Sequence, residues 1–341
     1  RMFCSIFFKT PDYICTMRYI LPFVLVFFIA ACSNPEKPAD DSIQVPDTSV
    51  LPAVTKRNFN EDSAYLHVAR QVAFGPRVPG TTAHKRCHDY LVSVLRSLAD
   101  TVYLQYATAV TFDRKTIPVM NVIASFNPSA TRRVLLCAHW DTRPFADQDT
   151  KDMNKPIPGA NDGGSGVGVL LELAAALKRD PIALGVDIVL FDAEDWGDNS
   201  GQTEDSYCLG SQYWGKNPHI PGYKADFGIL LDMVGAPNAM FGFEGYSLAE
   251  APAFLTRVWT AAADAGYGGY FRNFQRGYVT DDHYYVMKYT KIPMIDIIDS
   301  DPSTESHFGK YWHTHADNMD AIDKRTLKAV GQTLLNVLSA Y

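Results

Sequence analysis

The chain has 341 residues, of which 47% are hydrophobic and 20% are charged, and its formal net charge is -7. This length and composition suffice for one large globular domain with an ample core, or for such a domain with appendages. The acidic balance, without any basic stripe, argues against a nucleic-acid partner. We therefore expect a small or peptidic substrate.

The N-terminal segment, residues 1–32, is typical of a targeting signal. Met17 precedes an unbroken apolar run over residues 20–29, which is short for a membrane span, and small residues lead to Cys32. We expect translation to begin at Met17, so that residues 1–16 lie upstream of the protein. Ile-Ala-Ala-Cys32 resembles the lipobox of bacterial lipoproteins, in which the cysteine is acylated and becomes the mature N-terminus. The alternative is an uncleaved N-terminal anchor, and both interpretations imply export.

Residues 33–54 are rich in Pro, Asp, Ser and Lys and contain few bulky apolar residues, so they are predicted to form a flexible tether. The residues directly after the cysteine, Ser33 and Asn34, resemble those of lipoproteins sorted to the outer membrane. The sequence thus predicts a lipid anchor on Cys32, a tether, and an enzymatic domain over residues 55–341 at the periplasmic face of the envelope.

Apolar runs and helix-period segments alternate through the domain. The short apolar runs are typical of buried strands, and the longer segments repeat apolar residues with helical spacing. This alternation predicts an α/β fold, a single domain with a central, twisted, mostly parallel (mixed) sheet flanked by helices, whose ligands gather at the carboxyl ends of the strands. The predicted strands are Val119–Ala124, Val134–Ala138, Val186–Phe191, Phe227–Leu231 and Pro293–Ile298, and the predicted helices are Thr81–Leu98, Val167–Leu177, Ala251–Ala263 and Lys324–Leu338.

Three cysteines lie in the domain: Cys87, Cys137 and Cys208. Their spacing does not resemble a cysteine zinc site, so we expect buried residues. An odd number in an exported domain allows at most one disulfide. The pair that we consider is Cys87 with Cys208.

Ionisable residues follow three of the predicted strands. His139 and Asp141 come after one strand, Glu194 and Asp195 after another, and Asp232 ends a third. Strands of a parallel sheet bring their carboxyl ends to one edge. We therefore expect these side chains to gather there, together with the loop residues Asp162 and His313.

Each of these residues also has an ordinary structural interpretation. Asp162 is followed by Gly-Gly-Ser at the start of a predicted helix and could be its N-cap. His139 could be a satisfied strand-end histidine, and Asp232 could form a turn. The pair Glu194-Asp195 could be solvated, and His313 could lie in a surface loop. Their joint occurrence at strand ends and in loops favours a metal site.

Two carboxylates and an imidazole, from Asp162, Asp195 and His313, balance the charge of a zinc ion and leave a coordination position open for catalysis. In an extended segment Glu194 would point away from Asp195. It would then lie beside the metal but remain free to carry protons. We expect one zinc ion per chain.

The same residues resemble the ligand set of the co-catalytic zinc aminopeptidases. In that family the residue equivalent to Asp162 bridges two metals and the residue equivalent to Glu194 activates a bridging hydroxide. The resemblance would make His139 and Asp232 ligands of a second metal, or the remains of one. It extends from about Val119 to Ala321 and implies the zinc aminopeptidase-like fold.

Three details are more similar to the glutaminyl cyclases, which share that fold. The segment 232–238, Asp-Met-Val-Gly-Ala-Pro-Asn, resembles the cyclase segment after the corresponding aspartate. Asp281 stands before Asp-His where the aminopeptidases usually carry serine. Trp312 precedes the metal histidine, and Phe308 lies four residues before it. The lipobox and the Asp variant described next indicate a bacterial lipoprotein type.

The chain departs from the animal cyclases in two places. Asp195 stands where they carry glutamate, which shortens the metal-binding arm by one methylene. The segment 196–206 also differs, which weakens the assignment of Trp196 to the substrate pocket. We nevertheless include Trp196, with Phe308 and Trp312, among the substrate-binding residues.

The cyclase resemblance implies a substrate with an N-terminal glutamine, whose own α-amine attacks the γ-amide carbon to give pyroglutamate and ammonia. Zinc would polarise the amide oxygen. Glu194 would transfer the proton, Asp232 and Asp281 would orient the amine, and Trp312 and Phe308 would line the pocket. With one zinc, we expect Asp232 and Asp281 to share a proton.

Two alternatives remain open at this point. One is a two-zinc aminopeptidase that releases N-terminal amino acids, because His139 and Asp232 are both present. The other is a non-enzymatic lipoprotein, such as a transport or adhesion component that kept the fold. The second is disfavoured because no metal ligand or proton-transfer residue is missing.

Overall fold

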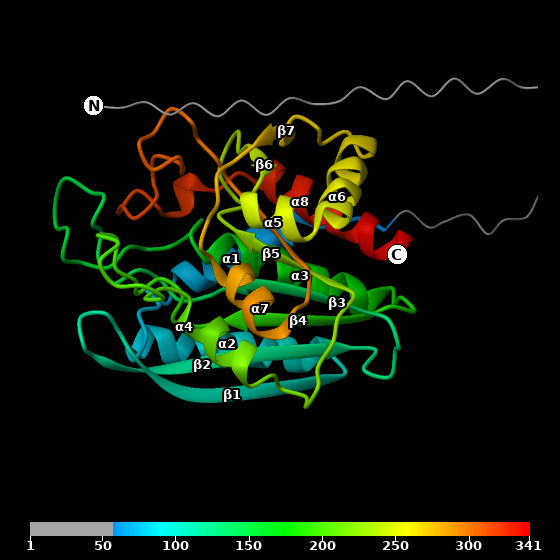
Figure 1. The fold of residues 1–341 in the computed structure, drawn as a ribbon, viewed down its shortest axis with the longest axis horizontal. Helices are drawn as coiled ribbons and strands as arrows, with labels where there is room; N and C mark the ends of the chain where they lie inside the picture. The colour runs from blue at the N-terminus through cyan, green and yellow to red at the C-terminus, as the bar shows by residue number, and fades with distance from the viewer. Residues whose placement is uncertain (1–56) are drawn as a thin grey trace, which may run out of the picture. The chain divides into compact units, whose positions relative to one another are not determined.

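The computed structural model describes residues 57–341. The predicted targeting segment 1–32, with its lipobox cysteine, and the predicted tether 33–54 lie outside the described residues. The described part of the chain forms an α/β domain around a central mixed sheet, as the sequence predicts. Figure 1 shows the sheet strands with the helices around them.

The sheet has the strand order β1-β2-β4-β3-β5-β8. Strands β3, β4, β5 and β8 are parallel, whereas β2 runs antiparallel to both β1 and β4. The parallel strands therefore deliver their carboxyl ends to one edge. The bounds are β1 Thr101–Val110, β2 Thr116–Phe126, β3 Arg133–His139, β4 Gly185–Phe191, β5 Phe227–Asp232 and β8 Met294–Ile298.

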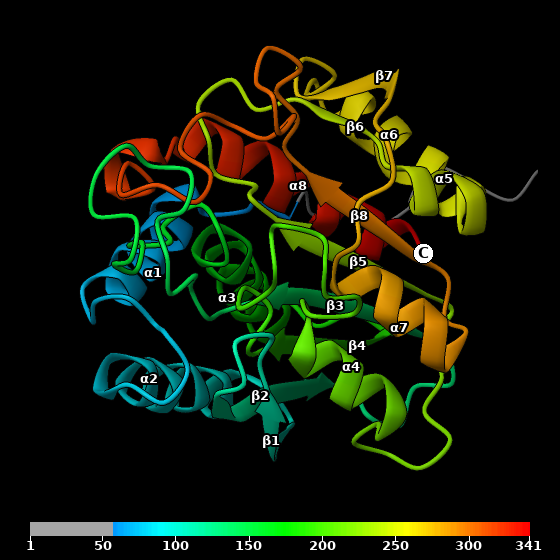
Figure 2. The ribbon, with the colours of Figure 1, turned by 60° about the vertical axis from the view of Figure 1, so that its left-hand side comes forward.

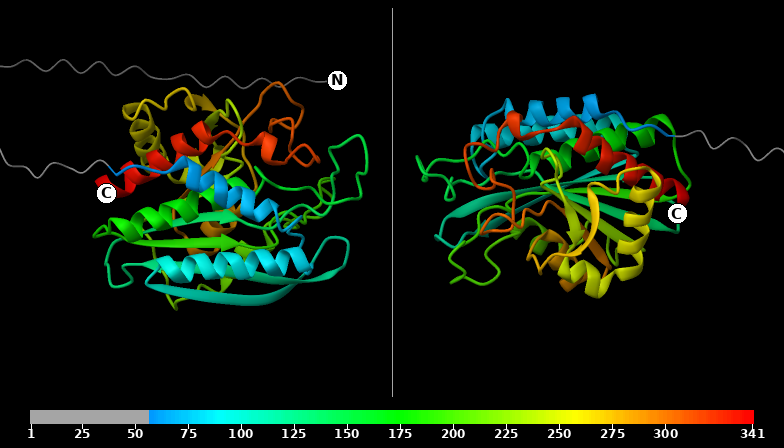
Figure 3. Two further views of the ribbon diagram at one scale, coloured as in Figure 1. Left: turned by 180° about the vertical axis from the view of Figure 1, so that it is seen from behind. Right: turned by 90° about the horizontal axis from the view of Figure 1, so that it is seen from above.

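Helices cover both faces of the sheet. Figure 3 (left) shows α1, α2, α3 and α8 in front of the strands, and Figure 2 shows α4 and α7 on the other face. Helices on the same face contact each other: α1 contacts α3 on one face, and α4 contacts α7 on the other. The bounds are α1 Glu61–Val72, α2 Thr82–Leu98, α3 Gly164–Arg179, α4 Leu209–Lys216, α7 Asp282–Thr290 and α8 Lys324–Ala340.

The central strands β3, β4 and β5 are buried along their whole length. Coverage by helices on both faces explains why their sequences are apolar runs rather than alternating patterns. All five predicted strands and all four predicted helices are present within a few residues. Strand β1 was not predicted, because it lies at the edge of the sheet and its residues are only partly buried.

A small second layer lies beside β8. It contains α5 (Gly245–Glu250), α6 (Pro252–Asp264) and a two-stranded sheet of β6 (Phe241–Phe243) and β7 (Phe271–Gln275). Helix α5 contacts β8, and α6 contacts α8. The chain then passes from β7 into α7, whose N-cap is Asp281. A 3-10 helix, η1 (Met319–Ala321), precedes α8.

The predicted disulfide between Cys87 and Cys208 is wrong. Cys87, Cys137 and Cys208 are buried free thiols. Cys87 lies in α2, among the core residues on that face of the sheet, whereas Cys208 is the N-cap of α4 on the other face. The sheet therefore separates the two thiols. Across residues 57–341, none of the helices combines the length and the apolar character needed to cross a bilayer.

Candidate metal centre and active site

The ionisable residues that follow the parallel strands do gather at one edge of the sheet. His139 is the last residue of β3 and Asp232 the last residue of β5, and Glu194 and Asp195 follow β4. Asp162 precedes α3, and all five side chains are buried. Burying this many carboxylates together is unfavourable unless a positive charge compensates their negative charges.

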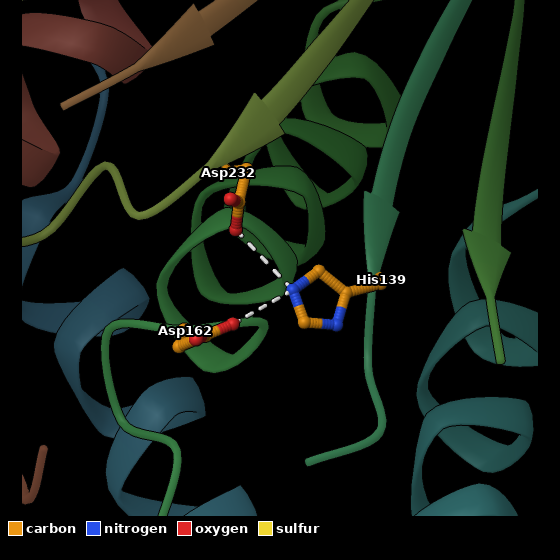
Figure 4. Close-up of side chains that lie close together, drawn as sticks. All are labelled: His139, Asp162 and Asp232. Carbon is orange, nitrogen blue, oxygen red and sulfur yellow. Dashed lines mark hydrogen bonds and ion pairs between the residues drawn. The ribbon is translucent and has the colours of Figure 1, made fainter. Parts of the chain in front are cut away.

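His139 lies between two of these carboxylates (Figure 4). Its Nε2 atom is 3.1 Å from Oδ1 of Asp162 and 3.2 Å from Oδ1 of Asp232. Burial opposes the charged imidazole, but the hydrogen bonds to neighbouring aspartates raise the pKa of His139 well above its usual range. The three residues offer one nitrogen and two oxygen atoms within 4.8 Å of one another, as a metal ion would require.

Asp162 also belongs to a second group of this kind, with Asp195 and His313. Both carboxylate oxygens of Asp195 are buried and accept no hydrogen bond, although Oδ1 lies 3.2 Å from Nε2 of His313. Two carboxylates and one imidazole form a donor set that zinc accepts. The unpartnered oxygens of Asp195 show that the residues fit a bound cation.

Two buried aspartates hold the loops that carry these residues. The carboxylate of Asp141 accepts hydrogen bonds from the backbone N–H groups of Glu194 and Asp195, at 3.0 and 3.1 Å. The carboxylate of Asp317 does the same for Asn161 and Asp162, at 2.7 and 3.1 Å. These bonds fix the backbone rather than the side chains, so the carboxylates of Asp162, Glu194 and Asp195 remain available.

Asp162 is not a helix N-cap. The N-cap of α3 is Gly163, whose backbone has a φ of 76°. A Cβ atom there would lie 2.8 Å from Cε1 of His139 and 2.9 Å from the carbonyl oxygen of Asp141. Glycine is therefore required for the close approach of this loop to the histidine.

A second layer of polar residues orients His313. Its Nδ1 atom lies 3.2 Å from Oδ1 of Asp147 and 3.1 Å from Nδ2 of Asn199. Asp147 in turn accepts hydrogen bonds from Arg143. A metal-binding histidine usually donates the N–H of its other ring nitrogen to a carboxylate such as Asp147. Nδ2 of Asn199, a donor, holds that carboxylate through a hydrogen bond of 2.7 Å to Oδ2 of Asp147. The sequence interpretation missed these residues, because they come from loops far from His313 along the chain.

Glu194 lies apart from Asp195, in a group with Cys208 and Asp281. The Cys208 thiol donates a hydrogen bond of 3.1 Å to Oε1 of Glu194. Burial, together with the negative charges of Asp195 and Asp281, raises the pKa of Glu194 well above its usual range. Glu194 therefore lines the same site as the two candidate metal-binding groups but belongs to neither of them.

Burial also raises the pKa of Asp232 to about 7, and the nearby charges of Asp281 and Asp162 add to this effect. The pKa of Asp281 is raised in the same direction, again chiefly by burial. Raised pKa values of this kind mean that protonation of some of these carboxyl groups is favoured when no cation compensates their charges.

Four of the residues in this region have a left-handed backbone conformation. Ala193, Cys208, Met233 and His313 have φ values of 54°, 59°, 49° and 54°. Non-glycine residues seldom adopt this left-handed conformation, and each instance costs about 1–3 kcal/mol. Each of these residues is a ligand-group member, a neighbour of one, or a contact of Glu194.

A cavity of about 770 Å³ opens over these carboxylates. Phe308 and Trp312 line it and are partly exposed. Their ring centroids lie 4.7 Å apart, and the Trp312 indole stacks on His313 at 3.8 Å. The predicted metal, proton-transfer and aromatic residues therefore meet in one cavity.

Trp196 is the exception, and its assignment to the substrate pocket is wrong. Its side chain is buried in a separate apolar cluster with Val78, Ile117 and Val119, and it does not line the cavity. Its ring makes an edge contact with Phe145, at 6.2 Å between centroids. Adjacency to Asp195 along the chain does not bring the indole into the cavity.

Comparisons with known proteins agree with this geometry. Residues 121–338 match the model of peptidase family M28. The structure of Tannerella forsythia glutaminyl cyclase is 52% identical, covers 83% of this chain and 99% of that chain, and superposes with a TM-score of 0.82. That of a Zn-dependent exopeptidase from Parabacteroides distasonis is 50% identical, covers 84% of this chain and 100% of that chain, and has a TM-score of 0.82.

A curated relative is the glutaminyl-peptide cyclotransferase of Boiga irregularis, which is 27% identical over 241 residues. The match covers 63% of this chain and 63% of the relative, so the chain spans a little under two thirds of that relative's length. The matched family region contains the whole set of clustered acids and histidines, from His139 to His313. The chain belongs to peptidase family M28.

Proposed function

We propose that this protein cyclises the N-terminal glutamine of peptides and proteins to pyroglutamate and releases ammonia. The observation that carries the proposal is the cavity itself, in which Phe308 and Trp312 stand next to the buried group of Asp162, Asp195 and His313. The relatives named as glutaminyl cyclases support this choice of reaction.

One zinc ion would be held by Asp162, Asp195 and His313. When bound, it would polarise the γ-carbonyl oxygen of the substrate glutamine and stabilise negative charge on that atom. Asp147 would accept the Nδ1–H of His313 and keep its imidazole oriented toward the ion, and Asn199 would hold Asp147 in place.

The chain's own residues would perform the proton transfers. The substrate α-amine nitrogen forms a bond to the γ-amide carbon, and the bond from that carbon to the amide nitrogen breaks. Glu194 takes the proton from the attacking amine and delivers it to the departing nitrogen, which leaves as ammonia. Asp232 and Asp281 accept hydrogen bonds from the amine and hold it over the amide. The flat faces of Trp312 and Phe308 pack against the glutamine stem and keep water away.

The proposal is tested by ammonia release from a glutaminyl peptide. The purified protein should release ammonia from a peptide with a free N-terminal glutamine, and none from the same peptide with an acetylated α-amine. Ammonia from the acetylated peptide would contradict the proposal, because ring closure needs the free amine.

A two-zinc aminopeptidase is the second candidate, and one observation favours it: His139, Asp162 and Asp232 form a further group with metal-binding geometry. The solved relative described as a Zn-dependent exopeptidase is in line with it. This enzyme would release free N-terminal amino acids. The aromatic pair beside His313 favours the cyclase.

We also propose that the mature protein begins at an acylated Cys32 and is anchored on the periplasmic side of the envelope, in the outer membrane. The apolar run over residues 20–29 and the lipobox-like end support this. Mass spectrometry of the mature N-terminus provides the test. An unmodified Cys32, or a retained Met17, would contradict it.

A further inference from the structure

The cavity continues well beyond the residues that the proposed reaction uses. Its walls include residues of the segment 272–280, which runs from β7 to the residue before the N-cap of α7, and residues of the loop 300–308. Arg272 and Tyr278 in the first segment are exposed, whereas the five carboxylates at the other end of the cavity are buried. We call these carboxylates the floor, which consists of Asp162, Glu194, Asp195, Asp232 and Asp281, and we call the segment 272–280 with Phe308 the outer wall.

Charge is segregated between the floor and the outer wall. Among residues 57–341, every acid that lines the cavity belongs to the floor, whereas Arg272 and Arg276 are its only lysine or arginine residues and both lie in the outer wall. A ligand that fits this pattern presents a free amine to the floor and a negative group to the outer wall.

Arg276 has free hydrogen-bonding capacity. Its Nε atom donates to Oγ of Ser300 at 2.6 Å, but its Nη2 atom is buried without a partner. Burial lowers the pKa of Arg276, and the charges of nearby acids oppose this shift; they are Asp296, Glu244, Asp232 and Asp299. Among residues 57–341, none of these carboxylates accepts a hydrogen bond from the guanidinium, whose Nη2 atom stays without a partner. An arginine with an unpaired, partly desolvated fork is suited to a carboxylate.

A ladder of ring contacts connects Arg276 to the metal-binding group. Its guanidinium carbon lies 4.5 Å from the centroid of the Phe308 ring, which packs on Trp312, which in turn stacks on His313. A peptide whose glutamine stem lies against the two aromatic rings would therefore reach Arg276 with its following residues. Each residue of an extended peptide advances about 3.5 Å, which brings the first or second side chain after the glutamine into range.

We infer that Arg276 is a specificity-determining residue that selects substrates with an acidic side chain in the first or second position after the N-terminal glutamine. This inference rests on the proposed function. Arg272, at the exposed mouth of the cavity, adds to the same positive potential. A carboxylate could not bind closer to the floor, because the buried acids would repel it.

The test compares two peptide amides, Gln-Glu-Glu-amide and Gln-Gln-Gln-amide, which differ in charge but have the same backbone. The unmodified protein should have a kcat/KM about tenfold higher for the acidic peptide, as expected for one charge-assisted hydrogen-bonded pair. The ratio should fall as salt is added, because the pair lies near the solvent.

The variant Arg276→Gln should bring the ratio of the two kcat/KM values close to one. Lys224→Gln makes the same change in net charge at an exposed residue just before β5, at the opposite edge of the sheet, and should leave the ratio as it is. Comparing ratios removes any general loss of activity. If Arg276→Gln does not fold, Arg276→Lys takes its place: it keeps the charge but loses the planar fork, and it should lower the ratio without abolishing it. An unchanged ratio in that variant would overturn the inference.

Equal kcat/KM values for both peptides in the unmodified protein would overturn the inference. A proportional loss on both peptides in Arg276→Gln would also overturn it, because Arg276 would then bind a backbone carbonyl that every peptide has. In both cases ammonia release would continue and the proposed function would stand. Release of ammonia from neither peptide would overturn the proposed function as well.

Discussion

The substitution Trp312→Ala should separate a role in the cavity from a role in the core. Trp312 is partly exposed, and its main ring contacts are Phe308 and His313. Its truncation removes two aromatic contacts of about 0.5–1.5 kcal/mol each. Because the Trp312 ring faces an open cavity, we expect only part of this energy to stabilise the fold. Loss of contact with about two methylenes of the glutamine stem costs about 1.6 kcal/mol of substrate binding. We therefore expect kcat/KM to fall at least about tenfold, and the free energy of unfolding to fall by less than about 2 kcal/mol.

Trp214→Ala provides the matched control. Trp214 is fully buried in the apolar cluster between the sheet and α7, so its truncation should cost about 3–5 kcal/mol of unfolding free energy. Denaturant titration of both variants gives the stabilities, and ammonia release from a glutaminyl peptide gives kcat/KM. A loss of stability in Trp312→Ala as large as that in Trp214→Ala, with kcat/KM unchanged, would refute the reasoning.

Four further outcomes follow from the site and its surroundings. Glu194→Gln should lower kcat by about 10²-fold or more while the zinc content stays the same, and normal turnover would assign the proton transfer to another acid. Cys208→Ala should lower kcat by up to about tenfold, since it removes the donor to Glu194, and Cys208→Ser should restore most of that loss; equal rates for the two variants would contradict this role. Chelation should abolish turnover and added zinc should restore it, and full activity in protein that elemental analysis shows to be metal-free would exclude a metal requirement. Although burial opposes it, the hydrogen bond from His283 lowers the pKa of Glu244 to about 2, below the usual value of 4.5. The stabilisation from Glu244, up to about 3 kcal/mol, is therefore present above pH 4.5 and is lost as the pH falls toward 2, so Glu244→Gln should destabilise the protein less at pH 3 than at pH 7.

The sequence predicted the central strands and the edge where the acids meet, because those features are encoded locally. A buried parallel strand is an apolar run, and an acid directly after it lies at the edge formed by the carboxyl ends of the strands. Asp147 and Asp317 could not be given their positions in this way. Their contacts join loops far apart in the chain, such as Asp317 with Asn161.

Trp196 and Cys208 show the opposite failure, in which local cues misled. Trp196 follows a metal-group residue, but its indole fits an apolar cluster built by Val78 and Ile117, which the local sequence does not reveal. Cys208 was considered for a disulfide with Cys87 because three cysteines in an exported domain allow one such bond. Its thiol instead contacts Glu194, on the opposite face of the sheet from Cys87. Both corrections depend on tertiary packing.

The central claim is ring closure at an N-terminal glutamine, and product analysis tests it most directly. One preparation of the purified protein is given, in parallel, a glutaminyl peptide and a leucyl peptide of otherwise identical sequence, and the products are identified by mass spectrometry. We predict a pyroglutamyl peptide with ammonia from the first and an intact second peptide. Free leucine at a comparable rate, with the glutaminyl peptide left uncyclised, would contradict the account and establish an aminopeptidase.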